Sequence, residues 1–276
     1  SEVARFNSTG LGIGVSPTRA LSVDGDADIN DLVIGRGGGN FTSNTLIGNL
    51  ALSSNTTGEQ NVALGHNSLY NNTFGNGQVA AGYKSLFNNT TGNYNVGLGA
   101  YNLECNTIGG CNVGIGYQAL NKNTTGNFNV AIGYQALCSN TTGQPNVAIG
   151  FAAMKCNTTG QSNVAVGDQV MMLNTIGCFN VALGYRAMQC NTTGQRNIAI
   201  GINALCENVT GCSNVAIGDG AMIRSTAGNR NIGIGATALG DANAGGSFNV
   251  AVGYLSAFKN TTGCFNVTLG NNTLQN

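Results

Sequence analysis

A repeat of seventeen residues occupies the chain from Asn44 to Asn276. Each unit opens on Asn-Val-Ala-Ile-Gly or a close variant, and every spacing is seventeen residues except one of eighteen before Asn249. A short unit of this kind cannot bury an apolar face alone and has to stack on its neighbours. The repeat therefore predicts a rod or prism of stacked rungs. The fourteen units begin at Asn44, Asn61, Gln78, Asn95, Asn112, Asn129, Asn146, Asn163, Asn180, Asn197, Asn214, Asn231, Asn249 and Asn266.

The consensus unit reads N-V-A-I-G-Y-x-A-L-x-x-N-T-T-G-x-x, with its residues numbered as positions 1 to 17. Its first five residues alternate with the period of a strand, which places Val113 and Ile115 on one face and Gly114 on the other. A second apolar pair, as in Ala119-Leu120, predicts a second strand in each rung. Two glycines and a polar turn in every unit argue against helices. Rungs stacked ~4.8 Å apart give a body on the order of 65 Å long.

Asparagine recurs at two points of the unit. Within Asn-Thr-Thr-Gly at positions 12 to 15 it is a turn signal, because Asn bonds its own backbone and Gly supplies a positive φ. The Asn at position 1, replaced only by Gln78, predicts a ladder of amides that satisfies buried turn carbonyls, with plain turn preference as the alternative. The predicted ladder includes Asn112, Asn129, Asn146, Asn163, Asn180 and Asn197.

Two deviations from the repeat are expected in its turns. Pro145 closes one unit at a position where a missing N–H should cost little. The extra residue before Asn249 is expected within residues 241–246, where an insertion is tolerated best.

Side-chain size along the unit predicts how the rungs are packed. Columns of Val, Ile and Leu or Met are expected to form one apolar seam along the rod. Such a seam is thin, since it yields ~1.5–3 kcal/mol per buried side chain against ~1–2 kcal/mol of backbone entropy for every residue. Position 3 is almost always Ala or Gly, and position 8 is mostly small. We interpret these small residues as a second face packed against other chains. The expected fold is an all-β, 17-residue-repeat β-solenoid or β-prism that assembles as a homotrimeric fibre.

The chain divides into an N-terminal segment without the repeat, 1–43, and the repeats at 44–276. The composition of the whole chain argues against two kinds of partner. Only 8% of residues are charged and the formal net charge is zero, so nucleic acid is not an expected partner. No stretch approaches the ~18–20 consecutive apolar residues that span a bilayer, so membrane insertion is not expected either.

Catalytic chemistry finds little support in the sequence. His66 is the only histidine, and it occupies position 6, where Tyr117, Tyr134 and Tyr185 stand in other units. We interpret position 6 as an exposed surface position. The carboxylates of the repeats are isolated from one another. We therefore expect no enzyme activity, no catalytic residues, no cofactor and no metal site.

Nine cysteines fall on either side of the Asn-Thr-Thr-Gly turn. Two units carry one cysteine on each side, which makes Cys105 with Cys111 and Cys206 with Cys212 candidate disulfides. Bridges between adjacent rungs or between chains, and free thiols, are the alternatives. The absence of a Cys-x-x-Cys pair argues against zinc or redox chemistry.

The N-terminal segment contains Gly10-Leu11-Gly12-Ile13-Gly14, then Pro17, then Leu21-Ser22-Val23-Asp24-Gly25-Asp26. With these motifs it resembles a segment frequent in bacteriophage tail fibres that mature with an intramolecular chaperone. The Asn-Val-Ala-Ile-Gly core is in turn similar to the head repeat of trimeric autotransporter adhesins. Both resemblances imply a trimeric β-fibre on a virion or an extracellular surface. The implied partners are copies of the chain itself and a host surface glycan or receptor, met by the turns and by positions 6 and 7.

Two other functions remain open from the sequence. Stacked rungs would align threonines at ~4.8 Å, which suits an ice- or surface-binding β-solenoid, although the threonines lie in a turn. End-to-end stacking of terminal rungs would instead build an extracellular filament or adhesin.

Overall fold

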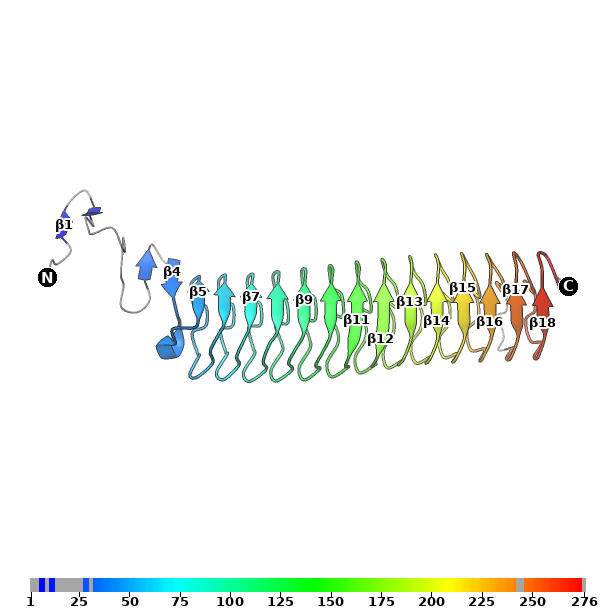
Figure 1. The fold of residues 1–276 in the computed structure, drawn as a ribbon, viewed down its shortest axis with the longest axis horizontal. Coiled ribbons are helices and arrows are strands. Elements are labelled where there is room, and N and C mark those ends of the chain that lie inside the picture. The colour runs from blue at the N-terminus through cyan, green and yellow to red at the C-terminus, as the bar shows by residue number, and fades with distance from the viewer. Residues whose placement is uncertain (1–4, 8–9, 13–26, 30–31, 242–245, 275–276) are drawn as a thin grey trace.

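The computed structural model describes residues 5–7, 10–12, 27–29, 32–241 and 246–274. From Thr45 onward the chain forms a β-solenoid, in which each repeat is one rung (Figure 1). The predicted all-β, 17-residue-repeat solenoid is therefore confirmed. Its parallel strands are β5 (Thr45–Ile47), β6 (Val62–Leu64), β7 (Val79–Ala81), β8 (Val96–Leu98), β9 (Val113–Ile115), β10 (Val130–Ile132), β11 (Asn146–Ile149), β12 (Asn163–Val166), β13 (Val181–Leu183), β14 (Ile198–Ile200), β15 (Val215–Ile217), β16 (Ile232–Ile234), β17 (Val250–Val252) and β18 (Val267–Leu269).

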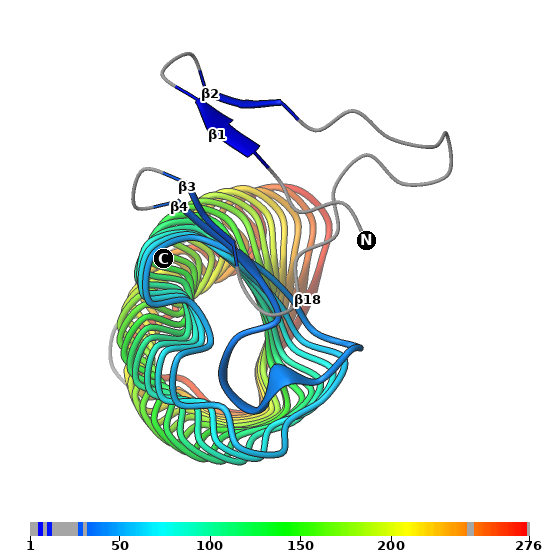
Figure 2. The same ribbon diagram turned by 90° about the vertical axis from the view of Figure 1, so that its left-hand side faces the viewer.

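The strands pair in register, so equivalent residues of successive repeats stand opposite one another. Val130 pairs with Val147 across β10 and β11, seventeen residues apart. Ile232 pairs with Val250 across β16 and β17, eighteen residues apart, so the extra residue leaves the sheet register intact. Most of the turn expected to hold that residue, 242–245, lies outside the described residues. Viewed along the rod, the rungs superpose with a gradual rotation (Figure 2).

The first rung is covered by an antiparallel pair of strands. β3 (Ala27–Ile29) pairs with β4 (Leu32–Gly35), which pairs antiparallel with β5. A 3₁₀ turn, η1 (Gly38–Asn40), follows, and Gly38 N–H donates to Leu52 O at 3.1 Å. Earlier in the chain, β1 (Arg5–Asn7) pairs antiparallel with β2 (Gly10–Gly12). The remainder of the segment that resembles tail fibres, 13–26, lies outside the described residues.

Each rung contains one strand, and the prediction of two is wrong. Leu120, in the expected second strand, has φ +51°, and Gln118 has φ +55°. These left-handed residues alternate with ordinary ones, so the chain bends where an extended strand would run straight. The conformation costs roughly 1–2 kcal/mol per L-residue. Inter-rung hydrogen bonds stabilise it, such as those from Leu120 N–H to Ala136 O at 3.0 Å and from Gln135 N–H to Tyr117 O at 2.9 Å.

The core contains the small residues, which reverses the predicted orientation of the strand. Ala131 at position 3 is fully buried, whereas Val130 and Ile132 on either side are partly exposed. The small side chains face the interior because the rung is too narrow for two rows of branched residues. The assignment of positions 3 and 8 to an interface between chains is therefore wrong. Apart from Leu46 at position 3 of the first rung, the largest core residues form one column at position 9: Leu52, Leu69, Leu86, Leu103, Leu120, Leu137, Met154, Met171, Met188, Leu205, Met222 and Leu239.

The Asn side chains at position 1 form a buried ladder along the rod. Asn112 Nδ2 donates to Gly126 O at 2.8 Å, and Asn112 Oδ1 accepts the N–H of Asn129 at 3.0 Å. The amide thus satisfies a turn carbonyl in its own unit and a backbone donor in the next. The same arrangement holds at Asn129, Asn146, Asn163, Asn180 and Asn197.

A second ladder at position 12 runs beside the first. Asn123 Nδ2 donates to Asn106 Oδ1 at 2.8 Å and to Gly126 O at 3.0 Å. Both ladders therefore converge on the carbonyl at position 15. A Cβ on Gly126 would lie 2.5 Å from Asn123 Oδ1 and 2.7 Å from Gly143 O. This glycine is required by space and not by a positive φ, which corrects the predicted reason for it. The positive φ occurs at position 5, as in Gly133 with φ +132°.

Position 17 is also part of the inter-rung ladder. Phe128 N–H donates to Gly110 O of the preceding rung at 3.1 Å. Pro145 has no N–H to donate there, and its peptide bond with Gln144 is cis. The proline therefore removes a donor that other rungs use, at a position where the missing N–H was expected to cost little.

Candidate functional site

The only histidine of the chain, His66, lies on the surface. His66 is exposed and stacks on Tyr83, with ring centroids 5.7 Å apart and planes at 14°. Among the described residues, no three His, Cys, Asp or Glu side chains gather as metal ligands would. His66 is therefore best understood through its aromatic neighbours.

An aromatic row runs along six consecutive rungs beside the strands. It comprises His66, Tyr83, Tyr101, Tyr117, Tyr134 and Phe151, whose neighbouring ring centroids lie 5.2–6.0 Å apart. Five rings come from position 6, which immediately follows the glycine at position 5. Tyr101 comes from position 7 because position 6 of its rung is Ala100. This exchange is visible in the repeat as an Ala-Tyr pair in place of Tyr-x, but the shared row was not predicted from it.

The geometry of the row gives it two roles. Tyr117, Tyr134 and Phe151 are stacked in parallel, with planes 16° and 8° apart, and such pairs contribute roughly 0.5–1.5 kcal/mol each beyond their burial. Tyr101 instead stands edge-on to Tyr83 and Tyr117, at 83° and 82°. The rings of Tyr83, Tyr117, Tyr134 and Phe151 remain 40–51% exposed. The row therefore ties rungs together and presents amphipathic rings to solvent.

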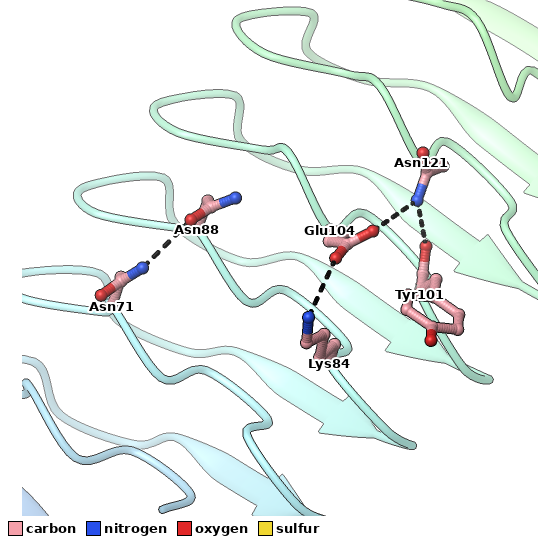
Figure 3. Close-up of polar contacts among 6 residues, drawn as sticks. All are labelled: Asn71, Lys84, Asn88, Tyr101, Glu104 and Asn121. Atoms are coloured by element: carbon pink, nitrogen blue, oxygen red, sulfur yellow. Dashed lines mark hydrogen bonds and ion pairs between the residues drawn. The ribbon is translucent and has the colours of Figure 1, made fainter.

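Polar side chains at positions 7, 10 and 11 flank this row (Figure 3). Lys84 Nζ lies 4.0 Å from Glu104 Oε1 and 5.6 Å from the centroid of Tyr83. Asn121 Nδ2 donates to Glu104 Oε2 at 3.0 Å and to Tyr101 O at 2.9 Å. The ion pair is partly exposed, so it adds little stability. Its position beside Tyr83 supplies hydrogen-bonding groups next to the aromatic surface.

The outward sheet face comprises the side chains at positions 2 and 4 of β6 to β17. All twenty-four are Val, Ile, Leu or Ala, from Val62 to Val252. They are partly or substantially exposed, and no other described segment of the chain covers them. The face measures about 58 Å by 10 Å, because strands lie ~4.8 Å apart and residues ~3.3 Å along a strand. An area of about 600 Å² is at the upper end for the surface patches of monomeric proteins.

The nine cysteines are all free. The candidate disulfides Cys105–Cys111 and Cys206–Cys212 are not formed, because the paired thiols have different surroundings. Cys206 Sγ lies 3.9 Å from Gln189 Oε1 of the preceding rung, whereas Cys212 Sγ donates to Thr210 O at 3.3 Å. In the other unit, Cys105 is partly buried and Cys111 is exposed on the far side of the turn.

Burial raises the pKa of several of these thiols. Desolvation raises the pKa of Cys206 to about 11, with the nearby Cys190 and Glu207 acting in the same direction. Burial also raises the pKa of Cys105, Cys138 and Cys190. These four side chains are therefore thiols and not nucleophilic thiolates at neutral pH.

The hydroxyl groups of the threonines at position 13 donate hydrogen bonds within the rod. Thr124 Oγ1 donates to Thr141 O at 3.1 Å, and Thr141 Oγ1 donates to Thr158 O at 3.1 Å. These hydroxyls reinforce the backbone ladder between rungs. They are not the free, flat array that the ice-binding hypothesis needs.

No protein-family model matches this chain, and no curated protein or solved structure matches it either. Within the part of the chain that the structure describes, no helix has the length and apolar character needed to cross a bilayer. The surfaces of the rod are therefore the basis for an inference about function.

Proposed function

We propose that the chain is the shaft of a homotrimeric structural fibre, carried on a virion or another extracellular surface, that attaches to a host. In this proposal it has no catalytic role. The observation that supports the proposal best is the outward sheet face, which is aliphatic over twelve consecutive rungs. A rod with such a face is suited to lateral association.

Copies of the same chain are the occupants that fit this face. Every copy repeats its Val and Ile ridges at the same ~4.8 Å spacing, so the ridges of neighbouring copies can interdigitate along the length of the rods. An area of about 600 Å² per chain approaches the ~800 Å² that each partner buries in a standard interface. Three faces around a common axis would leave the opposite sides of the rods in solvent.

The aromatic row is the proposed surface for attachment. Its Tyr rings offer apolar area together with hydroxyl groups, and Lys84 and Glu104 lie beside it. The apolar C–H faces and the hydroxyl groups of a glycan complement this combination. Positions 6 and 7 are also the positions from which contact with a host glycan or receptor was expected.

Light scattering tests the association. We expect the full chain to have three times the mass of one chain, and a variant with Ile132→Lys and Ile149→Lys to shift to the monomer. A matched variant, Gln118→Lys and Gln135→Lys, adds the same charge at position 7 and should keep the trimer. A monomeric wild-type chain, or equal loss of the trimer in both variants, would exclude association through the outward sheet face.

A further inference from the structure

In the column of side chains at position 17, a short side chain stands between two arginines, which leaves a gap on one side of the rod. Successive rungs place Phe179, Arg196, Ser213, Arg230 and Phe248 in one column. Their N–H groups donate to position 16 carbonyls of the preceding rung, for example Arg196 to Cys178 O and Arg230 to Cys212 O, both at 3.0 Å. The column is therefore held rung by rung, with a short side chain between two long cationic ones.

An aromatic ring supports each guanidinium from the side away from the gap. Arg196 Cζ lies 5.7 Å from the centroid of Phe179, and Arg230 Cζ lies 5.1 Å from that of Phe248. Phe248 is stacked on Phe265 in turn, with centroids 4.9 Å apart and planes at 9°. Such cation–π contacts restrict the arginines at an exposed site. Both faces of Phe248 are occupied, so it offers no face for stacking a nucleobase.

The gap opens into a shallow depression of about 330 Å³, whose lining includes Arg196, Ser213, Asn229 and Arg230. No carboxylate lines it, and within the described ranges neither arginine forms an ion pair. Asn229 Oδ1 accepts the N–H of Cys212 at 2.9 Å and Asn229 Nδ2 donates to Ala227 O at 3.2 Å, so this amide is engaged within the rod. The charged groups that line the depression are therefore the two guanidinium donors of Arg196 and Arg230.

We propose that this depression, the Arg196–Arg230 site, binds an anionic group of an acidic polysaccharide, either a uronate carboxylate or a sulfate ester. The arginines are two rungs apart, about 9.6 Å at ~4.8 Å per rung. Two charge-assisted hydrogen bonds of about 2.8 Å, one from each guanidinium, leave room between them for one oxoanion above Ser213. This inference rests on the attachment function proposed above and names a ligand class for it.

Binding of defined polysaccharides tests the site. The immobilised full chain is exposed to polygalacturonate, to dextran sulfate and to neutral dextran, with affinity measured by biolayer interferometry. We expect at least one acidic polymer to bind, and the double variant Arg196→Gln and Arg230→Gln to weaken that binding at least tenfold. The polymer that binds identifies carboxylate or sulfate as the preferred group.

Two further variants separate the site from general electrostatics. Arg36→Gln with Arg224→Gln removes the same charge elsewhere on the chain, away from positions 6 and 7, and should change affinity less than twofold. Ser213→Phe fills the gap without altering charge and should also weaken binding at least tenfold. Phe is compatible with this backbone, since Phe179 and Phe248 have φ +60° and Ser213 has φ +59°. Circular dichroism checks that each variant remains folded.

Three outcomes would overturn the proposal: no binding of either acidic polymer, equal losses in the two arginine double variants, or undiminished binding by Ser213→Phe. None of them bears on the wider attachment function, which is tested separately. If the wild-type chain still binds host cells and Tyr134→Ser abolishes that binding, attachment through the aromatic row stands and only the Arg196–Arg230 site is lost.

Discussion

Replacing one rung of the position 1 ladder tests whether buried amides hold the rod together. Asn129→Leu keeps the side-chain volume close to native but removes the bonds to Gly143 O at 2.9 Å and from Asn146 N–H at 3.0 Å. Gly143 O keeps a second donor, Asn140 Nδ2 at 3.1 Å. Asn146 N–H is left buried without its acceptor, which costs about 1–3 kcal/mol, and the lost bond to Gly143 O adds about 0.5–1.5 kcal/mol.

The expected total is about 3 kcal/mol, or about a hundredfold increase in local opening at 1.4 kcal/mol per tenfold change. Hydrogen exchange measured by mass spectrometry should show this increase in peptides that cover 129–146. Rungs far from the substitution should change less, because each rung contacts only its neighbours.

The control for this substitution lies in the same rung. Gln135→Leu removes one partly exposed bond, from Gln135 Nε2 to Gln118 Oε1 at 2.8 Å, and Leu255 occupies the same position in another rung. Its effect on exchange should stay within about twelvefold, since a typical hydrogen bond contributes only about 0.5–1.5 kcal/mol. If both variants exchange at the wild-type rate, the amide ladder is not a source of stability.

Three further predictions follow from the rungs and their side chains. Gly143→Ala places a Cβ 2.4 Å from Gly160 O and should lower the thermal midpoint by several degrees, whereas an unchanged midpoint would show that the rungs can separate there. Cys206 has a folded pKa of about 11 against 9.0, so the folded state retains its proton longer; stability should fall as pH rises from 9 to 11, and Cys206→Ser should reduce that slope in urea titrations. Tyr117→Ser removes ring contacts with Tyr101 and Tyr134 and should destabilise the rod by about 1–3 kcal/mol in the same titrations. A loss of less than about 0.5 kcal/mol would mean that the rings lie side by side without stabilising the rod.

The period alone was enough to predict the stacked rungs. Fourteen cores related to Asn-Val-Ala-Ile-Gly, all but one pair of neighbours seventeen residues apart, leave few other ways to satisfy strand hydrogen bonds. The buried amide ladder also followed, since the Asn or Gln at every position 1 has to find hydrogen-bond partners where it is buried. The ladder at position 12 was missed because Asn before Thr-Thr-Gly has a sufficient explanation as a turn residue.

The direction of the strand could not be decided from alternation. The alternation in Val-Ala-Ile predicts that the two faces of the strand differ, but it does not predict which of them faces the core. In Val130-Ala131-Ile132 the small residue is buried because a rung of seventeen residues encloses little space, and that space already holds Leu137 and two asparagines. An ordinary sheet would bury the branched residues instead. The same error produced the interface between chains that was assigned to positions 3 and 8.

The prediction of a second strand was wrong for a reason that side-chain patterns do not reveal. Ala119-Leu120 is apolar enough for a strand, but Leu120 and Gln118 adopt left-handed conformations that L-residues seldom populate. Only the hydrogen bonds between stacked rungs make this backbone favourable. Likewise, the Arg196–Arg230 site depends on which residues share a column three rungs long, and no single repeat reveals it.

The outward sheet face is the feature on which the proposed fibre depends, and electron cryomicroscopy of the purified chain can locate it. We expect threefold-symmetric rods about 60 Å long, with Val130 and Ile132 facing the symmetry axis and the aromatic row on the outside. Single rods with the outward sheet face in solvent would contradict the proposal. Trimers joined through another side of the solenoid would contradict it equally.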